Sequence, residues 1–291
     1  MITVLGATGN TGGRVAARLA EAGEQVRAVS RSGRAVPGAE PWQGDAGDRD
    51  FLTRAFTGAD AAYVLLPFDL FTPDYHTVQD RLGEAVTAAL RAARVPYVVA
   101  LSALGAEVPA GTGYLTALHR QEQRLRTLDA DVLFLRPGLF FESFLYSLDA
   151  MRAEGVHADT IDPGTRLPMI ATRDVGDAAA AALLTRTRTG VRELLGPVDL
   201  TVPEALADLG PRVGLPGLGY VRVPEEAMIG ALEQVGMPPD VAALHVEMNA
   251  AFNSGLVRSS GRTADATTPT TVATWAGGLG VAASSSPFSS P

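Results

Sequence analysis

The sequence predicts an α/β protein with a doubly wound parallel sheet, helices on both faces of that sheet and a smaller C-terminal α/β lobe. Strand-like and helix-like stretches alternate through the first half, and their short connections require right-handed crossovers between parallel strands. The run AAYVLLP at 61–67 is almost entirely apolar, which is typical of a central parallel strand covered on both faces. A length of 291 residues permits one large domain with a smaller lobe.

The elements of the first half follow from apolar periodicity. Expected strands cover residues 2–5, 25–30, 61–67, 97–103 and 131–137. Expected helices cover residues 12–22, 50–56, 77–93 and 116–128. Val15 and Leu19 fall on one face of the first helix, and Val78, Leu82 and Val86 on one face of the third, so each helix has an apolar side to place on the sheet.

The pattern changes after Gly138. An aromatic-rich helix is expected at 139–151, then a loop rich in Gly, Pro and Asp, and then a helix at 172–184 capped by Thr172 or Asp174. A strand and a helix follow, with Pro203 near the helix start, and residues 220–255 read as strand, helix, loop and helix. We therefore expect a first domain at 1–150, a smaller lobe at 151–280 and a disordered Ser/Pro-rich tail at 281–291. Segments near 168–190 and 256–278 can pack back on the first domain.

Composition excludes several classes of function. A net charge of −8 argues against a nucleic-acid partner, and the absence of cysteine removes disulfides, thiolate nucleophiles and zinc–cysteine sites. No apolar run is long enough to cross a membrane, and the first strand begins at residue 2, which leaves no room for a signal peptide. We therefore expect a cytoplasmic protein with no membrane partner. The sequence leaves its oligomeric state open, and a homo-oligomer is compatible with it.

All 24 basic residues counted as Lys or Arg are arginine, so the chain contains no lysine. This removes Schiff-base chemistry, the P-loop lysine and any dehydrogenase mechanism that uses a catalytic lysine. His76, His157 and His245 are scattered and show no metal-ligand spacing, so we expect no metal site.

Three glycines spaced three residues apart follow the first strand directly and open the first helix. In a strand–turn–helix unit, the first glycine makes the tight turn, the second lets the backbone approach a pyrophosphate, and the third lets helix and strand pack closely. Small polar residues stand between the glycines, and the whole loop predicts a dinucleotide site made by Gly6, Thr8, Gly9, Asn10, Thr11 and Gly12.

The end of the second strand indicates which dinucleotide binds. An NAD-selective site has an Asp or Glu there for the ribose 2′-hydroxyl, but this chain reads Val-Ser-Arg-Ser-Gly-Arg at 29–34. A guanidinium and a neighbouring hydroxyl suit a 2′-phosphate, so Arg31 favours NADP(H). The alternative is that Arg31 and Arg34 are solvated loop charges. Asp45, in QGDAGD at 43–48, is expected near the adenine amine.

The chain resembles the NmrA-like branch of the atypical short-chain dehydrogenases over residues 1–275. The motifs that carry the resemblance occur in the family's order: VLGATGNTGG (4–13), SRSG (30–33), GD (44–45), LSALGA (101–106), LRPGLFFES (135–143), PMIATRDVGDAAA (168–180), LLGPVDLTVPEAL (194–206), YVRVPEEA (220–227) and GMPPDVAALHVEMNAAFNSG (236–255). The resemblance implies a Rossmann-like domain that binds NADP(H) and a small lobe that forms a cleft with it. Members of this branch include quinone and azo-dye reductases, relatives acting on phenolic compounds, and regulators that bind the nucleotide without catalysis.

The resemblance also implies roles for particular residues. The glycine loop matches the phosphate loop, and Arg31 matches the reader of the 2′-phosphate. Leu66 and Pro67 match the segment that lies along the ribose and nicotinamide. Pro137 and Gly138 match the turn that faces the carboxamide.

The chain departs from the related dehydrogenases in the catalytic segment, where they carry Tyr-x-x-x-Lys. Tyr114 is followed four residues later by Leu118 and then by His119, so Tyr114 has no lysine to lower its pKa. We take Tyr114 and His119 as candidate catalytic residues. His119 stands near the place of the missing lysine and could donate a proton or hold the ribose hydroxyls. The alternative is that it lies on a solvated helix face.

Aromatic residues are expected to line a cleft for a flat acceptor. The candidates for substrate contact are Phe68, Phe140, Phe141 and Phe144, with Phe71 beside them, although any of these can instead be ordinary core. A quinone, azo bond or activated alkene can accept a hydride and take its proton from solvent. We therefore expect an NADPH-dependent oxidoreductase acting on a quinone-like or conjugated aromatic substrate without a Tyr–Lys pair, as in a tailoring reductase of secondary metabolism. The alternative is a non-catalytic NADP(H)-binding sensor.

Overall fold

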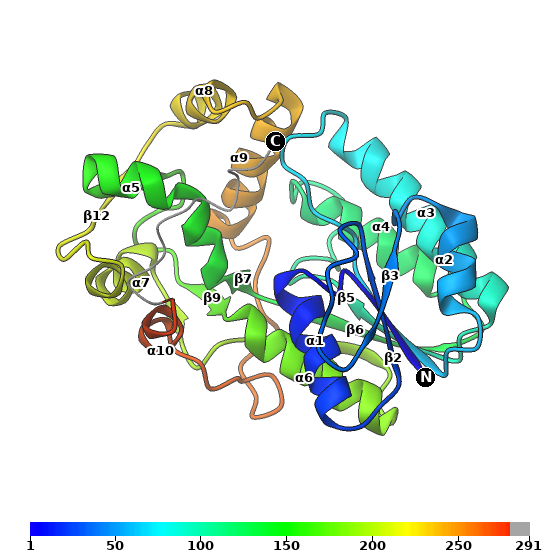
Figure 1. The fold of residues 1–291 in the computed structure, drawn as a ribbon. Helices are drawn as coiled ribbons and strands as arrows, with labels where there is room; N and C mark the ends of the chain where they lie inside the picture. The colour runs from blue at the N-terminus through cyan, green and yellow to red at the C-terminus, as the bar shows by residue number, and fades with distance from the viewer. Residues whose placement is uncertain (280–291) are drawn as a thin grey trace.

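The computed structural model describes residues 1–279, and the tail expected at 281–291 lies outside the described residues. Seven parallel strands form the main sheet in the order β10-β6-β5-β4-β1-β2-β3 (Figure 1). The order reverses between β1 and β4, which makes this the switch point of a doubly wound, Rossmann-like sheet and confirms the predicted fold class. The strands are β1 (Ile2–Leu5), β2 (Val26–Ser30), β3 (Glu40–Gln43), β4 (Ala61–Val64), β5 (Tyr97–Leu101), β6 (Asp131–Pro137) and β10 (Gly190–Leu194).

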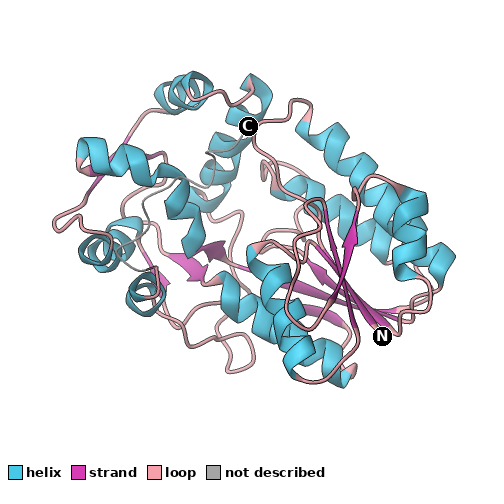
Figure 2. Cartoon of the chain, in the orientation of Figure 1, coloured by secondary structure: helices cyan, strands magenta, loops and turns pink. Residues whose placement is uncertain are grey.

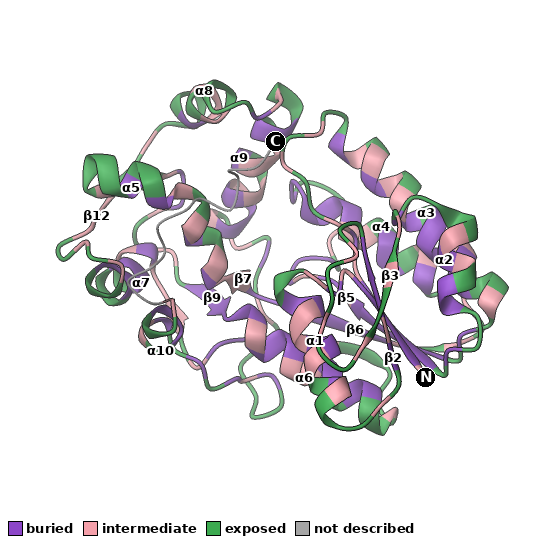
Figure 3. Ribbon diagram, viewed as in Figure 1, coloured by how far each residue is buried: buried purple, intermediate pink, exposed green. Residues whose placement is uncertain are grey.

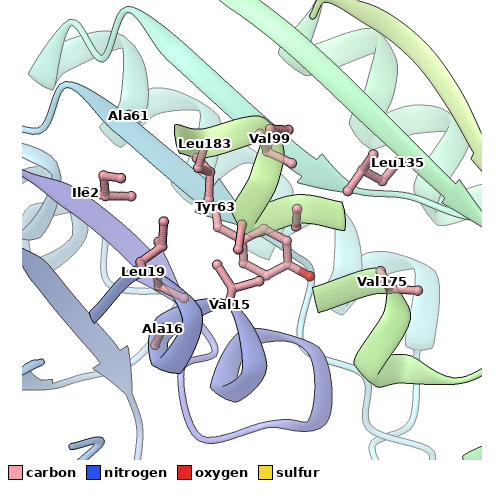
Figure 4. Packing of buried hydrophobic residues seen from close by; sticks show 14 of the residues in the cluster. Ile2, Val15, Ala16, Leu19, Ala61, Tyr63, Val99, Leu135, Val175 and Leu183 are labelled. Carbon is pink, nitrogen blue, oxygen red and sulfur yellow. The ribbon is translucent and has the colours of Figure 1, made fainter. Parts of the chain in front are cut away.

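Helices cover both faces of this sheet (Figure 2). On one face α1 (Asn10–Glu21) and α6 (Thr172–Thr185) pack on the strands, and Figure 4 shows Val15 and Leu19 of α1 meeting Val175 and Leu183 of α6 around the buried ring of Tyr63. The other face carries α2 (Arg49–Phe56), α3 (Tyr75–Ala93) and α4 (Leu115–Leu125). The strands are buried between these layers (Figure 3), as the apolar run at 61–67 predicts.

The smaller lobe is built mostly from residues after Gly138. It holds a sheet of order β11-β9-β7 and a parallel pair of β12 and β8, and its core contains Phe141, Phe144 and Trp275. Between these parts, α6 and β10 return to the main sheet, where β10 pairs with β6. The lobe's elements are β7 (Leu139–Phe140), α5 (Leu148–Glu154), β8 (Val156–Asp159), β9 (Leu167–Ile170), β11 (Asp199–Leu200), α7 (Val202–Leu209), β12 (Gly219–Arg222), α8 (Glu225–Gln234), α9 (Pro239–Asn253) and α10 (Val272–Gly277).

Several local expectations were wrong. The loop expected after the helix at 139–151 contains two strands, β8 and β9. The edge strand β3 was not predicted, because its sequence EPWQ has no apolar alternation and contains a proline. The single helix expected at 139–151 is instead a strand, a 3₁₀ helix (Phe141–Ser147) and then α5. The backbone begins as a strand because Leu139 and Phe140 pair in parallel with Met169 and Ile170.

The cap expected at the start of α6 was also wrong. The N-cap position is Ala171, and the Glu142 carboxylate accepts hydrogen bonds from the N–H and the hydroxyl of Thr172, at 3.1 Å and 2.7 Å. Asp174 instead accepts hydrogen bonds from the N–H and the hydroxyl of Thr270, at 3.0 Å and 2.6 Å. Glu142 therefore fastens the segment after β7 to α6, and Asp174 fastens the chain before α10 to the same helix. Within residues 1–279, no helix combines the length and apolar character needed to span a bilayer.

Candidate active site

The phosphate loop joins β1 to α1 in the geometry that the glycines predict. Gly6 has a φ of +74°, in the left-handed region that favours glycine. A Cβ on Gly12 would lie 2.3 Å from the carbonyl oxygen of Gly6, so only glycine lets α1 approach the strand this closely. The Tyr63 hydroxyl donates a hydrogen bond to Thr11 Oγ1 at 3.0 Å. This buried hydrogen bond ties the loop to β4, which carries Tyr63, and it engages the Thr11 hydroxyl with another protein side chain.

The space in front of this loop suits a phosphate-bearing ligand. A Cβ on Gly9 would meet no protein atom closer than 3.4 Å, so the protein leaves the space beside Gly9 open. A cavity of about 420 Å³ is lined by Thr8, Gly9 and Asn10 together with three arginines, Arg14, Arg34 and Arg173. The start of the 12-residue helix α1 adds its free N–H groups and positive potential. Arg14 is ion-paired with Asp177, so the open backbone, the start of α1 and Arg34 are what fit the pyrophosphate of a dinucleotide.

A second cavity, of about 220 Å³, brings several predicted residues together. Its lining includes Arg31 from the end of β2, Asp45 from the loop after β3, and Pro67 and Phe68 from the segment after β4. Gln43 Nε2 donates to the carbonyl oxygen of Arg31 at 3.2 Å and fixes the backbone there. Within residues 1–279, the exposed Arg31 guanidinium makes no hydrogen bond or ion pair. An unpaired guanidinium beside a carboxylate and a cavity can bind an adenosine that carries a 2′-phosphate.

Two further predicted segments stand at the carboxyl ends of β4 and β6. Leu66 is buried, and the carbonyl oxygen of Pro67 accepts a hydrogen bond from Gln79 Nε2 at 2.9 Å. Pro137 ends β6, and a Cβ on Gly138 would lie 1.8 Å from the carbonyl oxygen of Pro168. Glycine is therefore required at Gly138 for backbone packing against β9. The contact of these four residues with a nicotinamide stays a prediction.

A buried ion pair holds the end of β6. Arg136 donates two parallel hydrogen bonds to Glu122 of α4, from Nε at 2.8 Å and from Nη2 at 2.7 Å. Glu122 also accepts from Ser102 at 2.6 Å and from Arg126 at 3.2 Å. Burial alone would raise the pKa of Glu122, but the hydrogen bonds from Arg136 and Ser102 outweigh it and leave the pKa below its usual value. Sequence reasoning missed Glu122, Ser102 and Tyr63 because no local pattern marks them.

The two candidate acids stand at the start of α4 and within it, and both are engaged with the protein. The Tyr114 side chain is buried, and its hydroxyl donates to the carbonyl oxygen of Val241 at 2.9 Å. Burial raises the pKa of Tyr114 far above its usual value. His119 Nδ1 lies 2.8 Å from the carbonyl oxygen of Ala106, and because a carbonyl only accepts, Nδ1 carries the hydrogen there. Their catalytic roles stay predictions.

The phenylalanines predicted to contact substrate divide into two groups. Phe68 is 52% exposed, and its ring makes T-shaped contacts with the rings of Tyr75 and Tyr114 at centroid distances of 5.9 Å and 5.3 Å. Phe140 is half-buried and packs against the main core. Phe141 and Phe144 are buried in the core of the small lobe, as the alternative interpretation holds, and Phe141 lies against Trp275. Phe71 is exposed. No acidic or histidine cluster in residues 1–279 is arranged to hold a metal ion.

Comparison with known proteins gives the chain's relatives. Residues 6–186 match the NAD(P)H-binding family. A (4-alkanoyl-5-oxo-2,5-dihydrofuran-3-yl)methyl phosphate reductase of Streptomyces griseus is 34% identical over 83% of this chain and 83% of its own length. An NAD(P)H azoreductase of Xenophilus azovorans is 27% identical over 83% of this chain and 84% of its own length. The crystal structure of an Escherichia coli NADPH-dependent quinone oxidoreductase complexed with NADPH superposes with a TM-score of 0.79, covering 96% of this chain and 99% of that chain at 23% identity. These findings confirm the resemblance drawn from the sequence motifs.

Proposed function

This chain belongs to the NAD(P)H-binding family and is an NAD(P)H-dependent oxidoreductase, and we propose that it uses NADPH to reduce a small, flat, conjugated acceptor. The acceptor class comprises quinones, azo compounds, conjugated aromatics and conjugated ring ketones or lactones. The reductase names of both relatives favour this activity over the non-catalytic sensor that the sequence left open. A tailoring reductase of secondary metabolism is one form of it.

The unpaired Arg31 guanidinium at the second cavity is the observation that carries the preference for NADPH. It lines the cavity with Asp45, while Arg34 lies at the phosphate loop, with Nη2 3.2 Å from the carbonyl oxygen of Thr8. A 2′-phosphate accepts charge-assisted hydrogen bonds from such a guanidinium, whereas the 2′-hydroxyl of NADH gives it no charged partner. The pocket thus binds the nucleotide that carries a 2′-phosphate more tightly than NADH.

The exposed ring of Phe68 supports a flat acceptor. It stands beside Pro67, after β4, and T-shaped contacts with Tyr75 and Tyr114 hold it in place. A ring held in this way can stack on a planar acceptor and exclude water from its face. When bound, the nicotinamide supplies a hydride to the acceptor. Conjugated acceptors suit this site because the negative charge that develops on them is delocalised.

The reaction proceeds without a Tyr–Lys pair. The chain has no lysine, and the Tyr114 hydroxyl is committed to Val241. The side chains near the acceptor therefore hold the acceptor and the nucleotide in position. Holding two bound reactants in the right geometry supplies a large part of the rate acceleration.

A nucleotide titration and an acceptor panel test this function. NADPH oxidation is followed with a benzoquinone, an azo dye and an unsaturated lactone, and turnover of one or more of them is expected. Arg31→Ala should weaken NADPH binding by about ten- to a hundredfold, since a charge-assisted contact contributes about 1.5–3 kcal/mol, and should leave NADH almost unchanged. Arg49→Ala, another exposed arginine, is the matched control. Equal losses for both nucleotides would refute the role of Arg31, and NADPH binding without turnover of any acceptor would refute the reductase.

A further inference from the structure

An arginine of α6 reaches the cavity in front of the phosphate loop. Arg173, the second residue of α6, lines the cavity of about 420 Å³ together with Gly9 and Asn10 of the loop. Arg34 lines the same cavity from the chain after β2. Two segments that are far apart in the sequence therefore each bring an arginine to the place where the phosphates of a nucleotide are expected.

The packing of α6 on α1 explains the position of Arg173. A Cβ on Gly176 would lie 2.6 Å from the Cβ of Arg14 and 3.1 Å from the carbonyl oxygen of Thr11, so this glycine lets α6 lie directly against the first turn of α1. Figure 1 shows the two helices side by side. Residues three apart in a helix share a face, so Arg173 stands one turn before Gly176 on the side that contacts α1. The close approach of the two helices thus places Arg173 beside the phosphate loop.

The backbone on both sides of Arg173 is held by side-chain hydrogen bonds. The Thr172 hydroxyl donates to Glu142 at 2.7 Å, and the Asp174 carboxylate accepts from the Thr270 hydroxyl at 2.6 Å. Thr270 Oγ1 also accepts a hydrogen bond from Nε of Arg173 at 3.1 Å. Within residues 1–279, Nη1 and Nη2 of Arg173 make no hydrogen bond. The guanidinium is therefore anchored at one nitrogen, and its two terminal nitrogens keep their donors for a ligand.

The charges of Arg173 and Arg34 are less compensated than that of their neighbour in the cavity. Arg14 donates two hydrogen bonds to the carboxylate of Asp177, at 2.8 Å and 2.9 Å. Nε of Arg173 is 3.8 Å from Oδ1 of Asp174, which is beyond hydrogen-bond distance. Arg34 bonds a backbone carbonyl oxygen and, in the described part of the chain, forms no ion pair. Arg173 and Arg34 are thus the guanidinium groups of this cavity that can pair with an anion.

We propose that Arg173 binds the pyrophosphate of the dinucleotide from the side of α6, and that Thr270 is the positioning residue which holds its guanidinium. The proposal rests on the nucleotide binding in the proposed function and does not depend on which acceptor is reduced. The terminal nitrogens of Arg173 donate charge-assisted hydrogen bonds to a phosphate oxygen. NADPH and NADH share the pyrophosphate, so Arg173 contributes equally to the binding of both. Arg31, which lines the other cavity, contributes to NADPH alone.

The first test compares the two nucleotides by calorimetric titration, without turnover. Arg173→Gln should weaken NADPH and NADH by the same factor, about tenfold. This is the lower end of the range for a charge-assisted hydrogen bond, because the Arg173 side chain is 43% exposed and its charge is partly screened. Arg18→Gln is the matched control, since Arg18 is also 43% exposed and lies on α1, but does not line the cavity. R18Q should leave both affinities almost unchanged.

The second test concerns the support of the guanidinium. Thr270→Val removes the hydroxyl that holds Nε of Arg173, and it should weaken both nucleotides by a smaller factor than R173Q. Thr270→Ser keeps a hydroxyl and should restore wild-type affinity for both. Arg173→Lys keeps the charge but cannot bond Thr270 and a phosphate together, so its affinities should lie between those of wild type and R173Q. R173K replaces R173Q if R173Q does not fold.

Melting of the nucleotide-free variants separates binding from folding. T270V should melt below wild type, because the buried Asp174 carboxylate loses a donor, and T270S should restore Tm. If T270V lowers Tm but leaves both affinities at the wild-type value, Thr270 is structural only and the positioning role is refuted.

The remaining outcomes decide the role of Arg173. A loss in R173Q confined to NADPH would assign Arg173 to the 2′-phosphate and overturn the proposal. Unchanged affinities in R173Q, or equal losses in R173Q and R18Q, would overturn it as well. In each of these cases wild-type protein still binds NADPH and reduces an acceptor, so the proposed function stands. Failure of wild-type protein to bind either nucleotide would refute the proposed function and this proposal with it.

Discussion

Replacing Glu122 by glutamine should destabilise the fold and loosen the end of β6. The Glu122 side chain is 2% exposed and that of Arg136 is 10% exposed, so their ion pair is shielded from water. E122Q keeps the volume and one acceptor oxygen, but it places an NH₂ group against the guanidinium of Arg136. Among the described residues, Arg136 would then keep one ion-pair partner, Glu107, whose side chain is 44% exposed.

The size of the effect follows from this burial. Removing one partner of a buried pair costs about 3–5 kcal/mol, because the remaining charge is left uncompensated. For a domain of this size, 1 kcal/mol shifts Tm by about 2 °C, so E122Q should melt about 6–10 °C below wild type. Arg126→Gln is the matched control, since Arg126 is 43% exposed and bonds the same carboxylate. An exposed partner of this kind contributes at most about 1 kcal/mol.

The stability that Glu122 contributes depends on pH, because only its ionised form pairs with Arg136. The pKa of Glu122 is lowered in the folded state, so its ionised form stabilises the fold above its unfolded pKa of about 4.3. That contribution is lost as the pH falls through the folded value. In urea unfolding, the gap in free energy between wild type and E122Q should therefore be constant at neutral pH and shrink below about pH 4. Equal losses in E122Q and R126Q, or a gap that does not change with pH, would refute the reasoning.

Two further predictions concern the loop and the tyrosine. Gly9→Val should abolish NADPH binding measured by calorimetry with little loss of Tm, because no protein atom approaches a Cβ there within 3.4 Å. Gly12→Ala should instead lower Tm, because its Cβ would lie 2.3 Å from the Gly6 carbonyl oxygen. Unchanged NADPH affinity in Gly9→Val would show that the loop is only a structural turn. Tyr114→Phe should keep most of kcat with a quinone acceptor, because the tyrosine hydroxyl is hydrogen-bonded to the Val241 carbonyl oxygen. Loss of that hydrogen bond should lower the free energy of unfolding by about 0.5–1.5 kcal/mol. A thousandfold fall in kcat with intact nucleotide binding would show that Tyr114 is the acid.

The fold was predictable because its main signals are local. The apolar run at 61–67 and the glycine loop each specify a piece of backbone within about ten residues, and parallel strands joined by helices have few permitted topologies. The errors lie where the role of a polar side chain depends on a hydrogen-bond partner that is distant in the sequence. Asp174 bonds Thr270, 96 positions away, and Glu142 bonds Thr172, 30 positions away. Polar residues at a helix start give no sign of such partners.

The candidate site was predictable in part. Arg31 was chosen because it follows an expected strand and Asp45 because of the motif QGDAGD, and the structure places both at one cavity. Their contact with a nucleotide stays a prediction. The aromatic residues were less predictable, because Phe68 and Phe141 have the same side chain. One is exposed at a cavity and the other lies against Trp275, and residue type alone does not distinguish them. Arg173 lies at the phosphate loop because α6 packs on α1, so no sequence spacing marks it.

The position of α9 relative to the main domain is fixed by a backbone contact. Gly113 has a φ of +56°, and a Cβ on it would lie 2.0 Å from the carbonyl oxygen of Leu244, the residue before His245. Helix α9 therefore rests directly on the chain beside Tyr114, and Val241 and Tyr114 share a buried apolar cluster. Because backbone lies on both sides of this contact, it holds α9 against the start of α4. The exposed Phe68 segment lies outside this contact, so acceptors of different size are expected to be accommodated there.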